Sequence, residues 1–153
     1  MLLRNSWYTE NYTAGIPDAL AHGAVYGSAG EGRIASAARA DYAEAAVAVL
    51  TAENQAGRIY ELAGDTAYSL AELAAEISRQ SGKKIGYVNL PEAEYKNVLV
   101  KAGLPEAVTA LLADSDTGVS KSALFDDGHQ LSKLIGRPTT SLATAVGTVV
   151  GRT

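Results

Sequence analysis

Short apolar segments alternate with longer helical stretches along this chain, and this alternation most constrains its fold. Met1–Trp7, Arg58–Ala63 and Lys84–Asn89 each have the length and apolar content of a β-strand, and a brief extended segment, Ala24–Tyr26, lies between the first two. In Met1–Trp7 the apolar residues are consecutive, which is typical of a strand covered on both faces. Strands that alternate with helices form parallel sheets covered by those helices. The pattern predicts an α/β protein.

The helix that follows Ser69 has the clearest signals. Ser69 and Glu72 have the spacing of a capping box, in which each side chain binds a backbone N–H group of the other residue. Apolar residues then recur at the spacing of one helix face, at Leu70, Leu73, Ala74 and Ile77. Gly82 is expected to end this helix.

Weaker signals predict the other helices. Asp41 has Glu44 three residues later, so we interpret Asp41 as an N-cap, and the Asp126–Asp127 pair as another. We interpret Asp114–Ser122 as a polar loop. The remaining predicted helices are Ile16–His22, Pro91–Ala102, a short one after Pro105, Gly128–Ile135 and Ser141–Val150.

Three strands are too few for a well-covered parallel sheet, and no element precedes the first strand to pair with it. The 153 residues are 47% apolar and 20% charged, which suits one folded unit over residues 1–153. We therefore expect the C-terminal part of a larger α/β domain, or a homo-oligomer in which a second copy covers the sheet edge.

Composition excludes several classes of function. The chain has no cysteine, so it has no thiolate nucleophile and no disulfide, and we expect a cytoplasmic protein. Its net charge of −4 gives no basic surface for nucleic acid. The longest apolar run, Ala45–Leu50, is far shorter than the roughly 20 residues that cross a membrane. We therefore expect no membrane contact. His22 and His129 lie too far apart for a local metal motif, so we also expect no metal.

Two motifs resemble catalytic patterns only in part. The run Gly27–Gly32 has three glycines, but the next helix begins near Asp41, whereas a phosphate cradle needs its last glycine in the first turn of a helix. We interpret this run as a surface turn. Tyr42 has Ala46 four residues later, where a Tyr-x-x-x-Lys pair would need a lysine, so a proton-donor role for Tyr42 is disfavoured.

The segment that follows the first strand is the candidate ligand site. Within nine residues, Arg4–Tyr12, it has one tryptophan, two tyrosines, two asparagines, an arginine and a glutamate. Residues just beyond the carboxyl ends of parallel strands line the ligand crevice of open α/β sheets. Aromatic and amide groups suit a flat, weakly polar ligand. The alternative interpretation is that Trp7 and Tyr12 are core residues and the amides are helix caps.

Several longer stretches resemble a known family. They include LLRNSWYTENY, GSAGEGRIASAARADYAEAAVAVL, YELAGDTAYSLAELAAEISRQSGK and GLPEAVTALLADSDTG, followed by SKSALFDD and LSKLIGRPTT. Across essentially its whole length the chain is similar to the C-terminal half of the type 2 NAD(P)H:quinone oxidoreductases, which are NmrA-like atypical short-chain dehydrogenases. The resemblance implies a Rossmann-like fold with a few mostly parallel strands and five to six helices, without its glycine-rich nucleotide-binding half.

The resemblance also implies a function and the residues that perform it. Such reductases bind NADPH or NADH and transfer hydride to a quinone without a flavin. The resemblance makes Asn11 the catalytic candidate, which is expected to hydrogen-bond a quinone carbonyl. The residues expected to contact the quinone or the nicotinamide are Asn5, Trp7, Tyr8 and Tyr12.

Two departures from the family pattern leave other functions open. Ser6 replaces a glycine of the usual Arg-Asn-Gly-Trp sequence, and the glycine-rich phosphate-binding turn is absent. We therefore expect a natural truncation, a processed product or a cloned part of a longer protein, inactive without a cofactor-binding half. The alternatives are an NmrA-like regulator that senses dinucleotides without catalysis, and an inactive fold remnant.

Overall fold

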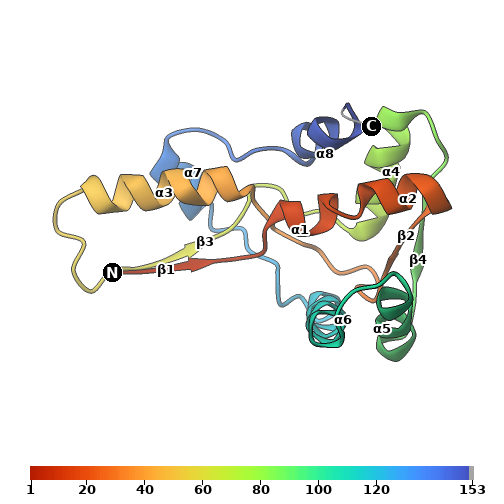
Figure 1. Cartoon of the computed structure of the whole chain (residues 1–153). Helices are drawn as coiled ribbons and strands as arrows, with labels where there is room; N and C mark the ends of the chain where they lie inside the picture. The colour runs from red at the N-terminus through yellow and green to blue at the C-terminus, as the bar shows by residue number, and fades with distance from the viewer. Residues whose placement is uncertain (152–153) are drawn as a thin grey trace.

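The computed structural model describes residues 1–151 and has the alternating α/β order that the sequence predicts (Figure 1). The strands are β1 (Leu2–Asn5), β2 (Ala24–Gly27), β3 (Ile59–Leu62) and β4 (Gly86–Asn89). The helices are α1 (Thr9–Thr13), α2 (Ile16–His22), α3 (Arg39–Thr51), α4 (Leu70–Ser81), α5 (Glu92–Lys101), α6 (Glu106–Ser120), α7 (Gln130–Ile135) and α8 (Leu142–Val150). No helix among the described residues is long and apolar enough to cross a membrane.

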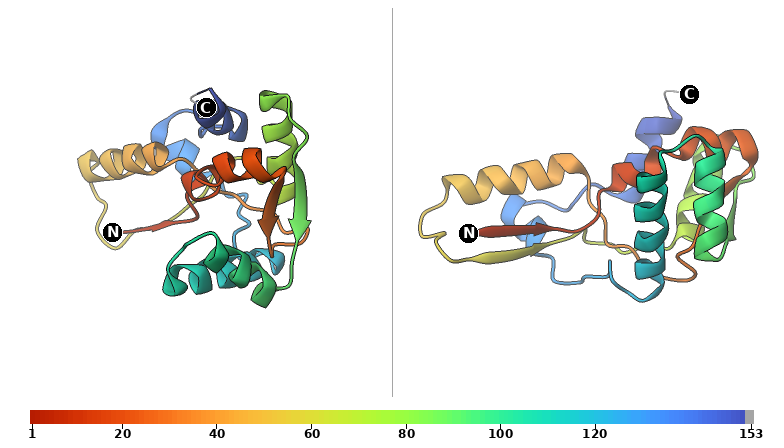
Figure 2. Two further views of the ribbon diagram at one scale, coloured as in Figure 1. Left: turned by 45° about the vertical axis from the view of Figure 1, so that its right-hand side comes forward. Right: turned by 60° about the horizontal axis from the view of Figure 1, so that its bottom comes forward.

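The strands form two separate parallel pairs rather than one sheet. β1 pairs with β3, and β2 pairs with β4, each over four residues. In Figures 1 and 2 the β1–β3 pair lies with α3 and α7 at one end of the molecule, and the β2–β4 pair lies with α2 and α4 at the other. The parallel direction of the strands is confirmed, but the prediction of a single sheet is wrong.

The expected burial of the first strand is also wrong. Leu3 alone in β1 is half-buried, whereas Leu2 is 47% exposed, and Ile59 on the neighbouring strand is 55% exposed. The β1–β3 pair is covered by α3 and α7 and is otherwise open among the described residues. Consecutive apolar residues therefore do not mean burial on both faces here.

Two apolar clusters form the core, one at each end. The larger lies between α2, α4 and α8 and includes Ile16, Ile34, Tyr68, Leu70, Leu73, Ile77, Val119 and Val146. The smaller joins α3, α7 and β3 and consists of Ala37, Tyr42, Ala45, Leu62 and Leu131. Since Ile34 and Ala37 belong to different clusters, the extended segment 34–38 runs from one cluster to the other.

The local helix signals around Ser69 are confirmed. The Ser69 side chain accepts from the Glu72 backbone N–H, and the Glu72 carboxylate accepts from the Ser69 backbone N–H. The helix ends at Gly82, whose φ of 70° is left-handed. Both signals act within four residues, so the surrounding fold does not alter them.

Asp41 is not the predicted N-cap. The N-cap of α3 is Ala38, three residues earlier, and Asp41 is fully buried in the first turn of the helix. Its carboxylate accepts hydrogen bonds from the backbone and hydroxyl of Thr140 and forms an ion pair with Arg137. Because these partners are almost 100 residues away in sequence, the local pattern could not reveal them.

Two predictions about polar stretches are also wrong. Residues 114–120 continue α6 instead of forming a loop, because Asp116 is buried and hydrogen-bonded while Val119 is in the core. The N-cap position of α7 is His129, and Asp126 instead accepts from the backbone N–H of Gly128. The described part of the chain has eight helical segments, more than the five or six expected.

Gly64, just after β3, lies against the segment that connects the two clusters. Its backbone N–H donates to the carbonyl of Ala35 at 2.9 Å, and a Cβ added to it would lie 2.1 Å from the carbonyl oxygen of Ser36. The obstacle is backbone, which cannot rotate away as a flexible side chain can. A side chain at position 64 would therefore separate β3 from segment 34–38.

Asp65 joins the end of β3 to helix α7 and to the loop that follows it. One carboxylate oxygen accepts from the Ser132 hydroxyl at 2.6 Å and lies 3.0 Å from the ring Nδ1 of His129. The other accepts from the backbone and hydroxyl of Thr139. Desolvation raises the pKa of Asp65, but these hydrogen bonds outweigh it and hold the pKa below its usual value.

We predict that Gly64→Ala lowers the free energy of unfolding by about 1–3 kcal/mol, because the new Cβ overlaps the Ser36 carbonyl. Gly86→Ala is the matched control, since a Cβ there meets nothing within 4 Å. Urea unfolding followed by circular dichroism measures both. Equal loss of stability in the two variants would contradict the prediction.

We predict that Asp65→Asn lowers the free energy of unfolding at pH 7 by about 1–3 kcal/mol. The pKa of Asp65 is lower in the folded chain than in the unfolded chain, so the ionised carboxylate stabilises the fold above about pH 4. That contribution is lost as the pH falls through the folded-state pKa. The difference in the free energy of unfolding between Asp65→Asn and the parent chain should therefore shrink. Urea titrations at pH 7 and pH 3 test this, with the exposed Asp114→Asn as control. A difference independent of pH would refute it.

Candidate functional site

The candidate segment leaves the carboxyl end of β1 and runs beside residues 34–38. The backbone N–H of Thr9 donates to the Ala37 carbonyl at 3.0 Å, and the Ala37 N–H donates to the Trp7 carbonyl at 3.2 Å. These bonds form a short parallel bridge between Tyr8 and Ala37. The bridge places Trp7–Thr9 directly beside the first turn of α3.

Tyr8 is held between two side chains of α3. Its ring meets the ring of Tyr42 edge-on, with centroids 5.4 Å apart and planes at 73°. The guanidinium carbon of Arg39 lies 5.2 Å from the centre of the Tyr8 ring, within the range of a cation–π interaction. The orientation of Tyr8 is therefore fixed from two sides.

Tyr42 is structural rather than a free acid. It is 4% exposed, and its hydroxyl donates to the Trp7 carbonyl at 3.3 Å. Desolvation by burial raises the pKa of Tyr42 well above its ordinary value. The phenol thus stays protonated and fastens the candidate segment to α3.

Asn11 and Glu10 both contact Arg39. The Arg39 guanidinium donates to Oδ1 of Asn11 at 3.4 Å. Both carboxylate oxygens of Glu10 accept from the Arg39 backbone N–H, at 3.0 and 3.2 Å. Sequence reasoning did not select Arg39. One feature of the sequence could have indicated it: Arg39 lies just before Ala40 and Asp41, at the start of a helix that follows an extended segment.

Tyr12 faces away from the other candidates. Its ring packs against the larger core cluster, and its hydroxyl donates to Asp116 at 3.2 Å. Desolvation and the nearby carboxylate raise the pKa of Tyr12. Burial also raises the pKa of Asp116, although the hydrogen bonds from Ser28 and Tyr12 partly offset it. Tyr12 supports α1 from the core side, in line with the alternative interpretation of Tyr12 as a core residue, and its contact with the quinone or the nicotinamide stays a prediction.

The structure thus brings together Tyr8, Asn11 and Arg39, with Trp7 attached through its backbone. Trp7 and Asn11 are half-buried, so their side chains are partly open to solvent. Asn5 is exposed at the end of β1, and its side chain has no hydrogen-bond partner among the described residues. We define Trp7, Tyr8, Asn11 and Arg39 as the α1–α3 cluster.

The glycine run is already hydrogen-bonded within the protein. The backbone N–H groups of Ser28, Ala29 and Gly30 donate to a carboxylate oxygen of Asp116, the hydroxyl of Tyr87 and the amide oxygen of Asn89, at 3.0, 3.2 and 2.9 Å. A phosphate cradle needs such N–H groups free. The run therefore fits the predicted turn and does not fit a phosphate site.

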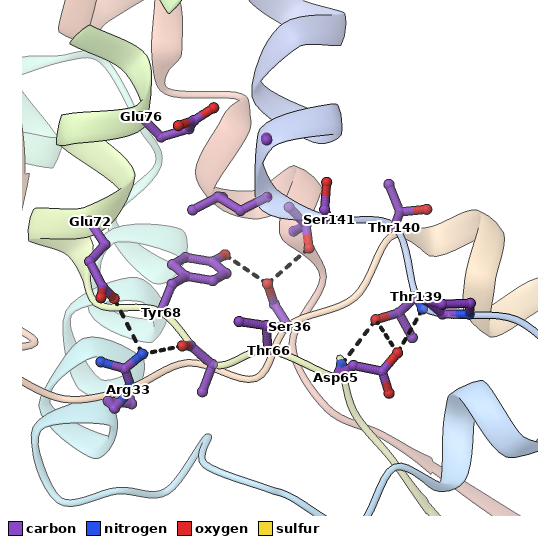
Figure 3. A pocket seen from close by; sticks show the side chains of 15 residues that line it. Arg33, Ser36, Asp65, Thr66, Tyr68, Glu72, Glu76, Thr139, Thr140 and Ser141 are labelled. Carbon is purple, nitrogen blue, oxygen red and sulfur yellow. Dashed lines mark hydrogen bonds and ion pairs between the residues drawn. The ribbon is translucent and has the colours of Figure 1, made fainter. Parts of the chain in front are cut away.

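A cavity of about 520 Å³ lies behind the candidate segment, between α4 and α8 (Figure 3). It touches that segment only at Thr9. There the hydroxyls of Thr9, Ser36 and Tyr68 form a hydrogen-bonded chain, with Ser36 2.9 Å from Thr9 and 2.7 Å from Tyr68. Arg33 at its rim is paired with Glu72. These polar groups of the cavity thus bind one another.

No group of three histidine, cysteine, aspartate or glutamate side chains within residues 1–151 is arranged to hold a metal ion. The chemistry available to the α1–α3 cluster is aromatic stacking, hydrogen-bond donation by an amide and a guanidinium, and positive charge. These groups suit a flat ligand with a carbonyl oxygen.

No protein-family model matches the chain. Quinone oxidoreductase 2 of Escherichia coli (strain K12) is 56% identical over 145 residues, which are 95% of the chain and 51% of that protein. The structure of the NADPH-dependent quinone oxidoreductase QOR2 from E. coli complexed with NADPH is similar at a TM-score of 0.93 and 54% identity, over 95% of the chain and 52% of that structure.

A second solved structure is similar over the same extent. Citrobacter sp. triphenylmethane reductase matches with a TM-score of 0.91 and 34% identity, over 97% of the chain and 52% of that structure. The chain spans about half the length of the curated relatives it matches. The chain is therefore a close homologue of about half of E. coli Quinone oxidoreductase 2, and it has the fold of the matching part of these reductase structures.

Proposed function

We propose that the chain is the substrate-side half of an NAD(P)H-dependent quinone oxidoreductase that transfers hydride without a flavin. The observation that carries the proposal is the α1–α3 cluster at the carboxyl end of β1, where open α/β folds bind ligands. The similarity to Quinone oxidoreductase 2 over 95% of the chain supports it.

Three residues of the cluster, and Asn5 beside it, have a role in this proposal. The Asn11 amide donates a hydrogen bond to a quinone carbonyl oxygen as negative charge develops there. Tyr8 and Trp7 offer aromatic surface for the flat quinone or the nicotinamide. Asn5, exposed at the end of β1, is assigned a contact with the same ligand.

The bound cofactor would supply the hydride, and a proton would complete the hydroquinone. The residues of this chain fit the nicotinamide end of such a cofactor, because the cluster offers aromatic and amide groups. The run Gly27–Gly32 does not fit the pyrophosphate end, since its N–H groups have protein partners. We therefore assign binding of the phosphates to the half of the reductase that this chain does not span.

We predict that Asn11→Ala lowers kcat for menadione reduction by about 10²–10³-fold, the typical loss when one donor to a developing oxyanion is removed. The assay protein is a hybrid in which the chain replaces the matching half of E. coli Quinone oxidoreductase 2, with the 153-residue chain tested in parallel. KM for NADPH should change little, since Asn11 is assigned to the quinone.

The matched control is Asn97→Ala, which removes an exposed asparagine with no hydrogen-bond partner among the described residues. It should leave kcat unchanged. An Asn11→Ala hybrid as active as its parent would remove the role given to Asn11. A hybrid that binds NADPH but reduces no quinone would instead favour a dinucleotide-sensing regulator.

A further inference from the structure

Arg39 is the cation of the α1–α3 cluster, and its contacts divide between its backbone and its side chain. The backbone N–H is held by both carboxylate oxygens of Glu10, at the start of the 13-residue helix α3. The guanidinium lies over the Tyr8 ring and donates to Asn11 Oδ1. Glu10 therefore fixes where α3 begins, while the guanidinium is directed toward the ligand-facing residues.

The guanidinium of Arg39 has no carboxylate partner among residues 1–151. Four other arginines, by contrast, form ion pairs with acidic side chains. These pairs are Arg4 with Glu61, Arg33 with Glu72, Arg79 with Glu76, and Arg137 with Asp41 and Glu44. An arginine side chain has five N–H donors, and the bond to Asn11 uses one. The positive charge of Arg39 is thus not neutralised by a salt bridge.

The contact with Asn11 determines which end of its amide faces outward. An asparagine amide has one acceptor oxygen and a nitrogen with two donors. Because the oxygen accepts from Arg39, the nitrogen is the end left for a ligand. A nitrogen that faces a carbonyl donates to it, whereas an oxygen in that place would repel the negative charge that forms during reduction.

We propose that Arg39 is a positioning residue, which holds the Asn11 amide with its nitrogen toward the carbonyl oxygen of the hydride acceptor. This inference rests on the proposed quinone reduction. Arg39 acts through Asn11: it binds the amide oxygen and draws electron density toward it, so the outward N–H groups become stronger donors. The Tyr8 ring beneath the guanidinium keeps it in place.

The test compares Arg39→Met with Arg58→Met in the hybrid enzyme. Methionine keeps the unbranched apolar stem but has no donor, and Arg58 is an exposed arginine whose side chain has no partner among the described residues. We expect Arg39→Met to lower kcat for menadione by about 10- to 100-fold, as a small misplacement of an orienting group does. KM for NADPH and the Arg58→Met enzyme should be unaffected. Arg39→Lys, which keeps the charge and one donor, should recover part of the loss.

A double variant separates positioning from a general structural role. In the Asn11→Ala enzyme, Arg39→Met should lower kcat less than about twofold further, because the amide that Arg39 orients is gone. If Arg39 were only structural, the two losses would multiply. Multiplied losses, or an unchanged kcat in Arg39→Met alone, would overturn the proposal.

A second readout does not depend on catalysis. In ¹⁵N–¹H spectra of the 153-residue chain, the side-chain amide signals of Asn11 should shift in Arg39→Met and not in Arg58→Met. Unmoved signals would overturn the inference even if the enzyme reduces quinones. If the signals shift but the protein reduces no quinone, the Arg39–Asn11 contact is supported and the proposed function is contradicted.

Discussion

The extended segment 34–38 is the constraint on which both ends of this molecule depend. At Ile34 it enters the larger core cluster, and at Ala37 it enters the smaller one. Between them the Ser36 carbonyl lies so close to Gly64 that only glycine fits there. The same segment forms hydrogen bonds with Trp7 and Thr9. The place of the candidate ligand residues therefore follows from how this one segment is packed.

The arrangement explains how a small surface cluster can be ordered. Tyr42 is buried beneath Tyr8 and binds the Trp7 carbonyl, so the aromatic part of the cluster rests on the core. Tyr12 and Asp116 hold α1 from the opposite side. The proposed quinone reduction needs orientation of this kind, because hydride transfer depends on the geometry of donor and acceptor. The half-buried Asn11 and the exposed Arg39 are then fixed relative to each other by their hydrogen bond.

Short-range signals predicted the elements that depend on neighbouring residues. The helix after Ser69, with its capping box and its apolar face, is as expected because these contacts span four residues or fewer. Asp41 and Asp116 were misinterpreted because each is buried against partners about 90 or more residues away. The contact of Tyr12 with Asp116 spans 104 residues, so the local pattern did not reveal it either. Arg39 was missed because its partners Glu10 and Asn11 lie 29 and 28 residues before it in the sequence. The segment Arg4–Tyr12 was selected because its place at a strand end depends only on chain order.

The central claim is that a quinone binds at the α1–α3 cluster and not in the cavity between α4 and α8. The most direct test is a titration of the ¹⁵N-labelled 153-residue chain with menadione, followed by ¹⁵N–¹H spectra. We expect the signals of Trp7, Tyr8, Asn11 and Arg39 to shift together and to saturate. Shifts concentrated at the cavity residues Thr66, Ala67 and Ala143, or no saturable shift at all, would contradict this account.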